Sequence, residues 1–273
     1  MYKRMNEQLQ KEGAMALVTG ASSGIGLAYA RELARRGYDL LLVSNEQERI
    51  GTVAEELVAA FGVKTIPLCM DLARSEAARE LYDYCEREKL QIGILVNNAG
   101  IFFFDDLTEV APERIETMLL LHIRTVTLLC RYFGAAMKRR RAGYILNMSS
   151  LSAWTPAPGI SVYAASKSYI RKFSQMLRYE LHQYGVGVTT VCPGAIATGL
   201  YNLSDYYQRL ALRLGVMMKP ERLARKGLRA MFARRDYILP GAVNRFFVLA
   251  LYLLPVQLIY YIKEHTKLYR YGR

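Results

Sequence analysis

The stretch Thr19–Gly26, which reads TGASSGIG, decides the fold of this 273-residue chain. It follows an apolar run typical of a buried strand and opens an amphipathic stretch typical of a helix. Its glycines allow a tight turn and let the backbone approach a phosphate closely. The free N–H groups and the dipole at the helix N-terminus favour an anion there. The spacing GxxxGxG differs from the commoner GxGxxG, and many glycine turns bind nothing. Its position after the first strand favours a phosphate site built from Gly20, Ser22, Ser23, Gly24, Ile25 and Gly26.

Short apolar runs alternate with longer amphipathic stretches through most of the chain. The expected strands are Ala14–Thr19, Tyr38–Val43, Val63–Leu68, Ile92–Val96, Tyr144–Met148 and Val186–Val191. The expected helices are Gly24–Arg36, Glu46–Phe61, Arg74–Glu88, Pro112–Lys138 and Tyr163–Gln183. Strands this apolar, separated by helices, predict an α/β fold with a doubly wound parallel sheet covered on both faces. We expect a polar tail over 1–13, one domain over 14–240 and an apolar, basic extension over 241–273.

Composition narrows the classes of function. Four cysteines without a CxxC pair and only three histidines argue against a disulfide framework and against a metal site. The N-terminus lacks the apolar core of a signal peptide, so we expect a cytoplasmic protein. The net charge of +13 is concentrated near the C-terminus, where it suits anionic lipid or an anionic substrate, or forms a solvated cationic face. No nucleic-acid motif accompanies the charge, so we expect no nucleic-acid partner.

The residues that follow each strand are informative because ligands bind at the carboxyl ends of parallel strands. Asp71 and Leu72 follow the third strand, where the carboxylate suits an adenine amino group. Asn98, Ala99 and Gly100 follow the fourth, where small residues and an amide let a ribose lie close. Either segment alone is compatible with an ordinary turn. Together they predict one ligand-binding edge of the sheet.

Proton-transfer chemistry is indicated after the fifth strand. Ser150 follows that strand, and Tyr163 and Lys167 stand four apart on the next expected helix, hence on one face. A free tyrosine has a pKa of about 10, and a nearby ammonium lowers it towards a useful range for general acid/base catalysis. Ser150 is then placed to donate a hydrogen bond to a substrate oxygen. A YxxxK match alone is equally compatible with surface residues.

The combination resembles the short-chain dehydrogenase/reductase family. The stretch Thr19–Gly26, Asp71, the NNAG segment, Ser150, Tyr163 and Lys167, and a CPG segment followed by Thr198 occur in family order and spacing, between about Ala14 and Thr198. The resemblance implies a seven-stranded sheet, a bound nicotinamide dinucleotide, and hydride transfer between a carbonyl and an alcohol. It implies catalysis by Ser150, Tyr163 and Lys167, with Lys167 also at the nicotinamide ribose. It places Pro193, Gly194 and Thr198 beside the nicotinamide amide, and implies pairing through the long helices into a homodimer or homotetramer.

One residue departs from the family pattern. The long helix usually carries an asparagine that helps to hold a relay water, and here the segment reads Leu121-His122-Ile123-Arg124. We expect His122 to hold that water with an altered pH dependence. The alternative is a packed histidine with no relay role.

The cofactor is less sharply defined. Asn45 occupies the position after the second strand where an acid binds a free 2′-hydroxyl and an arginine binds a 2′-phosphate. With no acid at that position, the sequence favours NADP(H) over NAD(H), and the neighbouring Glu46 keeps NAD(H) as the alternative.

The C-terminal quarter indicates a hydrophobic substrate. We expect residues 199–235 to form a lid with a large apolar surface made by Tyr201, Tyr206, Tyr207, Leu210, Leu214, Val216, Met217 and Met218. Such groups suit an acyl chain, a long-chain base or a steroid, or simply pack the lid on its domain. The apolar run Phe246–Ile262 is short for a membrane span and contains Pro255, so we expect it to pack on the lid or to contact a membrane surface. The rival hypothesis to an enzyme is a catalytically weak dinucleotide-binding sensor or scaffold.

Overall fold

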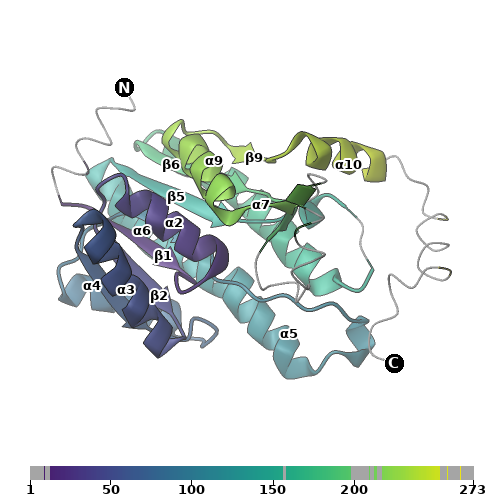
Figure 1. Ribbon diagram of the computed structural model, residues 1–273, viewed down its shortest axis with the longest axis horizontal. Coiled ribbons are helices and arrows are strands. Elements are labelled where there is room, and N and C mark those ends of the chain that lie inside the picture. The colour runs from purple at the N-terminus through teal and green to yellow at the C-terminus, as the bar shows by residue number, and fades with distance from the viewer. Residues whose placement is uncertain are drawn as a thin grey trace.

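A seven-stranded parallel sheet forms the centre of the molecule, for which we analysed a computed structural model (Figure 1). The structure describes residues 13–155, 158–197 and 217–252 and a few isolated positions outside these ranges. The strands run in the order β3-β2-β1-β4-β5-β6-β9, so the winding reverses between β1 and β4. Their bounds are β1 Met15–Thr19, β2 Leu40–Ser44, β3 Thr65–Cys69, β4 Ile92–Asn97, β5 Gly143–Met148, β6 Val186–Val191 and β9 Tyr237–Ile238. A crevice at such a reversal is where this class of sheet binds ligands.

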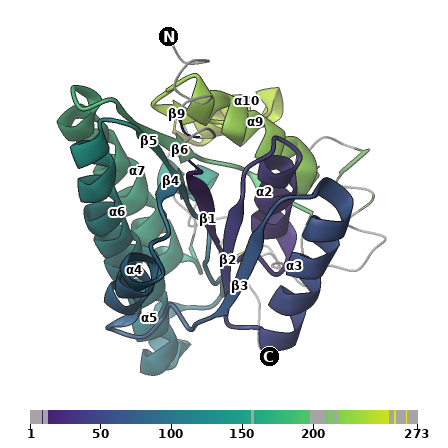
Figure 2. The same cartoon turned by 90° about the vertical axis from the view of Figure 1, so that its left-hand side faces the viewer.

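Helices cover both faces of the sheet (Figure 2). One layer holds α2 (Gly24–Ala34), α3 (Gln47–Phe61) and α9 (Pro220–Phe232). The other holds α4 (Ala77–Arg87), α6 (Val126–Arg140) and α7 (Ser161–His182), and α5 (Pro112–Leu119) precedes α6. The predicted single-domain, doubly wound α/β fold is confirmed.

The two layers explain why the strands are apolar throughout. Ala16 and Val18 of β1 pack in the core beneath α2 and α9, whereas Met15 and Leu17 pack in the core beneath α4 and α6. Successive side chains of a strand point to opposite faces, and here both faces are covered. A continuous apolar run is therefore what this position requires.

The helix expected over Pro112–Lys138 contains an irregularity that periodicity did not predict. Between α5 and α6 the chain widens into a π turn, η2, over Leu120–Thr125. Wide turns of this kind are frequent at functional sites. It contains His122, the residue that departs from the family pattern.

Other differences concern short elements and the C-terminal quarter. The strand β9 and a two-stranded sheet of β7 (Ala195–Ile196) and β8 (Met217–Met218) were not predicted, because two-residue strands carry no readable period. The helix α9 lies within the range expected for the lid, yet Leu223 and Leu228 are fully buried against the α2 layer. Most other residues expected in the lid lie outside the described residues.

The C-terminal extension begins with α10, Ala242–Tyr252. The side chain of Phe246 in this helix is 74% exposed. The rest of the expected apolar run to Ile262 falls almost entirely outside the described residues. Within the part of the chain that the structure describes, each helix is too short or too polar to cross a membrane.

Candidate active site

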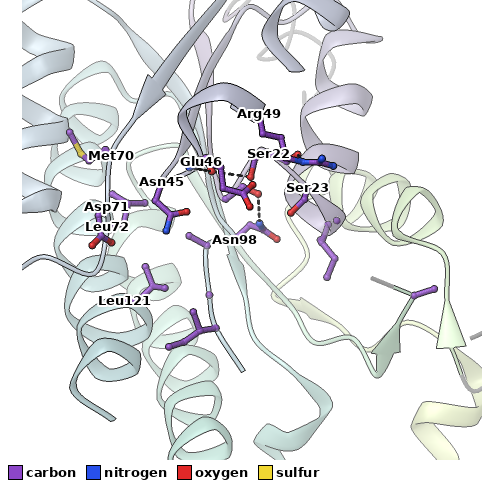
Figure 3. A pocket seen from close by; sticks show the side chains of 18 residues that line it. Ser22, Ser23, Asn45, Glu46, Arg49, Met70, Asp71, Leu72, Asn98 and Leu121 are labelled. Atoms are coloured by element: carbon purple, nitrogen blue, oxygen red, sulfur yellow. Dashed lines mark hydrogen bonds between the residues drawn. The ribbon is translucent and has the colours of Figure 1, made fainter. Parts of the chain in front are cut away.

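A cavity of about 670 Å³ opens at the carboxyl ends of β1 to β4 (Figure 3). In Figure 3, Ser22, Ser23 and Arg49 lie on one side of it, and Asp71 and Leu72 lie on the other. It is lined by Gly20, Ser22, Ser23, Gly24, Ile25, Ser44, Asn45, Glu46, Arg49, Met70, Asp71, Leu72, Asn98, Ala99, Gly100, Ile101, Leu121 and Ala197. The residues that the sequence placed around a dinucleotide are thus gathered at one site, except for Gly26, Thr198 and those at its nicotinamide end.

The glycine turn is shaped by close backbone approaches. Gly20 has a φ of +64°, and a Cβ there would lie 3.0 Å from Ala99 Cα. A Cβ at Gly26 would lie 1.9 Å from the Gly20 carbonyl oxygen. Gly26 therefore serves the packing of turn against helix, and it does not line the cavity. Thr198, the other expected cofactor residue missing here, lies outside the described residues.

Asn98 holds this turn in place. Its side-chain amide donates to the carbonyl oxygens of Thr19, at 3.0 Å, and Gly20, at 3.3 Å. The hydroxyl of Thr19 accepts from the backbone N–H groups of Asn98 and Ala99, at 2.9 and 3.0 Å. The loops after β1 and β4 are therefore fixed to each other by four hydrogen bonds.

Arg49 is a lining residue that the sequence reasoning missed. It lies in the first turn of α3, and its Nε donates to the Ser22 carbonyl oxygen at 2.9 Å. It is the only cation among the described residues that line this cavity. The sequence offered one signal for it. Arg49 lies one helical turn beyond Asn45, so its side chain can reach the carboxyl end of the second strand.

A second, smaller cavity of about 70 Å³ continues the first, and both are lined by Ile25, Asn98, Gly100 and Ile101. Its wall includes all four expected catalytic residues and two of the residues expected beside nicotinamide, namely Ser150, Tyr163, Lys167, His122, Pro193 and Gly194. Ser150 caps the short 3-10 turn η3 (Leu151–Ala153), where its Oγ accepts from Ser152 N at 3.2 Å. The Ser150 hydroxyl hydrogen is left for another acceptor.

Lys167 is buried one helical turn after Tyr163 on α7. Its side chain donates to the Met148 carbonyl oxygen at 3.3 Å, and Nζ lies 5.4 Å from the centre of the Tyr163 ring. The residue is 6% exposed. Burial penalises the ammonium and lowers the pKa of Lys167 to about 8.

His122 is bonded at both ring nitrogens. Its Nε2 accepts from Ile101 N at 3.0 Å, and its Nδ1 lies 3.0 Å from Ser166 Oγ. The residue is 1% exposed. Burial, and secondly the positive charge of Lys167, lower the pKa of His122 well below its ordinary value.

Two phenylalanines lie near Tyr163, and the sequence reasoning missed them too. The ring of Phe102 meets that of Tyr163 edge to face at 5.0 Å between centroids. The buried Phe103 belongs to a small apolar cluster that includes Val162 and Tyr163. Three consecutive phenylalanines from 102 to 104, directly after the NNAG segment, were the available signal.

Comparison with known proteins settles the family. The sequence profile described as short chain dehydrogenase matches residues 14–205. The chain belongs to the short-chain dehydrogenase family. The resemblance read from the motifs is therefore confirmed.

Other members show how far the likeness extends. The chain is 37% identical over 199 residues to the very-long-chain 3-oxoacyl-CoA reductase of Anas platyrhynchos, covering 70% of this chain and 62% of that protein. It is 32% identical over 206 residues to the inactive hydroxysteroid dehydrogenase-like protein 1 of Homo sapiens, covering 74% and 61%. This short-chain dehydrogenase thus spans less than two thirds of the length of these curated relatives.

A solved structure with the same fold covers nearly the whole chain. The short-chain dehydrogenase from Sphingobium yanoikuyae in complex with NADPH superposes with a TM-score of 0.76 at 28% identity. The match covers 95% of this chain and 98% of that one.

Proposed function

We propose that this protein is a nicotinamide-dependent oxidoreductase that interconverts a carbonyl and a secondary alcohol on a hydrophobic substrate. One observation carries the proposal. Ser150, Tyr163 and Lys167 line a single cavity that continues into the larger cavity beside the glycine turn. A carbonyl held in this cavity would meet the hydroxyls of Ser150 and Tyr163. The cofactor that we expect in the larger cavity would lie next to it.

The larger cavity suits a dinucleotide. At Gly20 and Gly26 a side chain would meet backbone atoms, so the turn keeps its N–H groups close to any phosphate bound there. Asp71 and Leu72 suit the adenine end, and Gly100 and Pro193 suit the nicotinamide end. When bound, a nicotinamide dinucleotide supplies or accepts the hydride.

Tyr163 is the general acid/base in this proposal. During reduction its hydroxyl donates a proton to the carbonyl oxygen, while Ser150 donates a hydrogen bond to the same oxygen. The charge that develops on that oxygen is stabilised by donors that are already in place. Lys167, whose Nζ lies 5.4 Å from the centre of the Tyr163 ring, stabilises the phenolate left on Tyr163, and we expect it to bind the nicotinamide ribose as well.

The cofactor we favour is NADP(H). No acid stands at Asn45, and the guanidinium of Arg49 lies at the glycine turn, where it suits a 2′-phosphate. Glu46 also lines the cavity and opposes that charge. The relative from Sphingobium yanoikuyae is described in complex with NADPH, which agrees with this choice.

For the substrate we favour an acyl or steroid-like molecule. Phe102 and Phe103 give the surroundings of Tyr163 an apolar character. The relative from Anas platyrhynchos is named as a reductase of very-long-chain 3-oxoacyl-CoA, and the human relative is named for hydroxysteroids. The assay that tests the proposal follows NADPH and NADH absorbance separately with 3-oxoacyl thioesters, 17-ketosteroids and long-chain ketones. Turnover with none of them would contradict it.

A second candidate is a dinucleotide-binding sensor or scaffold with weak catalysis, because the human relative is named as inactive. The variant Tyr163→Phe distinguishes the two candidates. A sensor keeps its dinucleotide affinity and its output in this variant, whereas an enzyme keeps the affinity and loses turnover.

Self-association through the long helices completes the proposal. A shallow groove of about 530 Å³ on α5 and η2 is lined by Glu116, Leu119, Leu120, Ile123 and Arg124. Leu119 there is 41% exposed, so an apolar side chain is available on this face for a second copy to cover. Leu119→Glu should lower the mass of the particle in light scattering.

Membrane contact of the C-terminal extension is tested separately by flotation with anionic vesicles.

A further inference from the structure

His122 lies between two segments of the active site that are far apart in sequence. On one side is the Gly100–Ile101 segment, which lines both cavities, and on the other is the first turn of α7, which carries Tyr163. We propose that His122 is a positioning residue: a neutral imidazole that ties these two segments together through both ring nitrogens and passes no proton. That these two segments hold cofactor and catalytic groups rests on the proposed function. The hydrogen bonds of His122 do not.

The first ring nitrogen is fixed as an acceptor. Ile101 N lies 3.0 Å from His122 Nε2, and a backbone N–H can only donate. The lone pair of Nε2 is therefore occupied by that hydrogen. A proton added to Nε2 would face the N–H of Ile101 and would leave this buried donor without its acceptor.

The second ring nitrogen is fixed as a donor. Ser166 Oγ donates to the Tyr163 carbonyl oxygen at 2.7 Å, and a carbonyl can only accept. The single hydroxyl hydrogen of Ser166 is used there, so its contact of 3.0 Å with His122 Nδ1 requires the hydrogen to come from Nδ1. The chain of bonds runs from Ile101 N–H through the ring to Ser166 and on to the backbone of Tyr163. It selects one neutral tautomer, with the hydrogen on Nδ1.

The surroundings also disfavour the imidazolium. The ring is almost completely buried, and it faces Lys167 and Tyr163 of α7. No carboxylate lines the smaller cavity among the described residues. A cation at His122 would therefore lie near the ammonium of Lys167 without a counter-charge, and burial lowers the pKa of His122 well below its ordinary value.

The loop after β4 is shaped to admit the ring. A Cβ at Gly100 would lie 2.8 Å from His122 Nε2, a distance that real Cβ atoms do not tolerate. Gly100 thus allows the loop to close on the imidazole, and the π turn η2 sets the position of the ring. Because an imidazole nitrogen offers one hydrogen-bonding site in its ring plane, no site remains for a relay water. A relay through His122 would have to break one of its two bonds.

The first test is nitrogen NMR of the unmodified protein with labelled histidine. The chain has three histidines, so the spectrum holds three ring systems, and His122→Gln assigns one of them. An exposed histidine changes its charge between about pH 5 and 8. We expect the His122 signals to stay those of the neutral tautomer with Nδ1 protonated throughout this range. A change of charge within it, or the other tautomer, would overturn the proposal.

A matched pair of variants separates positioning from relay. The glutamine amide in His122→Gln reaches as far as Nε2 and keeps an acceptor for Ile101. The shorter amide in His122→Asn lies near Nδ1 and keeps the donor to Ser166 only. Without its acceptor the Gly100–Ile101 segment loosens in the free protein, and NADPH binding must order it again. We therefore expect His122→Asn to raise the dissociation constant of NADPH by about tenfold, at most the free energy of one hydrogen bond, and His122→Gln to raise it by less than about threefold.

Turnover gives the complementary readout. Both variants should lower kcat while the apparent pKa of its pH profile stays in place, because no proton passes through the ring. A shifted profile in both variants, with NADPH affinity unchanged, would show a relay and overturn the proposal. If wild-type protein turns over no substrate, the proposed function fails, while the NMR titration and the NADPH affinities still decide the role of His122.

Discussion

Lys167 Nζ lies 5.4 Å from the centre of the Tyr163 ring, one helical turn further along α7. An ammonium at this distance is attracted to the aromatic ring, and more strongly to a phenolate. Burial holds the pKa of Lys167 at about 8, so the ammonium predominates at neutral pH. Lys167 is therefore placed to stabilise a phenolate at Tyr163, which lines the smaller cavity.

Tyr163→Phe removes the proton-carrying hydroxyl and keeps the ring. We expect turnover to fall by about 100-fold to 10,000-fold, the usual contribution of a general acid/base. The dissociation constant of NADPH, measured by fluorescence, should change by less than about threefold because the ring still fills its place. Tyr169→Phe is the matched control on the same helix, where the hydroxyl bonds Thr127 Oγ1 at 2.9 Å outside both cavities. Full activity in Tyr163→Phe would rule out the proposed chemistry.

Arg49→Ala tests the choice of cofactor. A 2′-phosphate paired with this guanidinium gains a charge-assisted hydrogen bond, so its loss should weaken NADPH binding by about 10-fold to 100-fold. The affinity for NADH, which has no 2′-phosphate, should stay nearly constant. Titration calorimetry with each cofactor gives both numbers. Arg79→Ala, on α4 and paired with Asp83, controls for the loss of one positive charge. An equal loss for NADPH and NADH would mean that Arg49 only shapes the turn through Ser22.

Gly26→Ala tests the packing of the glycine turn. The added methyl would lie 1.9 Å from the Gly20 carbonyl oxygen, so the backbone must move. We expect a loss of about 1–3 kcal/mol in the free energy of unfolding by urea, together with weaker dinucleotide binding. In contrast, a Cβ at Gly51 in α3 meets nothing within 4 Å. Gly51→Ala should therefore raise the stability by about 0.5–1 kcal/mol. Two variants of equal stability would contradict this account of the turn.

Much of this arrangement was readable from sequence because it depends on local signals. The turn at Thr19–Gly26 and the apolar run before it predict a strand, a cavity-lining turn and a helix in one place, and the structure has all three. The four-residue spacing of Tyr163 and Lys167 fixes their common face once α7 exists. Family order then supplied the seven-stranded sheet, whose seventh strand, β9, is only two residues long.

The remainder depends on contacts between distant segments. The partners of His122, Ile101 and Ser166, lie 21 and 44 residues away, and no periodicity links them. Arg49 lies four residues beyond Asn45, and only the fold shows that the first turn of α3 brings its guanidinium back to Ser22. The π turn η2 has no sequence signature of its own. Asn98 lines the cavity where a ribose was expected, and the bonds from its amide to the glycine turn were not predicted.

The burial of Lys167 predicts a pH-dependent stability. Its pKa is lowered from 10.5 to about 8 in the folded protein, so between these values the unfolded chain binds more protons than the folded one. Stability from this group therefore rises with pH across that window and is reduced below about pH 8 by up to roughly 3 kcal/mol. Lys167→Met removes the buried charge. Its free energy of unfolding relative to wild type should accordingly be most favourable near neutral pH and should decline as the pH approaches 10.

The measurement is urea unfolding of both proteins without cofactor at a series of pH values. Lys172→Met, at an exposed position on the same helix, controls for the loss of a lysine charge. Lys167 also donates a hydrogen bond to the Met148 carbonyl oxygen, so the loss of this bond changes the absolute stability of the variant. The dependence of the stability difference on pH reports only the proton bound by Lys167. A stability difference between Lys167→Met and wild type that stays constant over this range would show that Lys167 keeps its ordinary pKa.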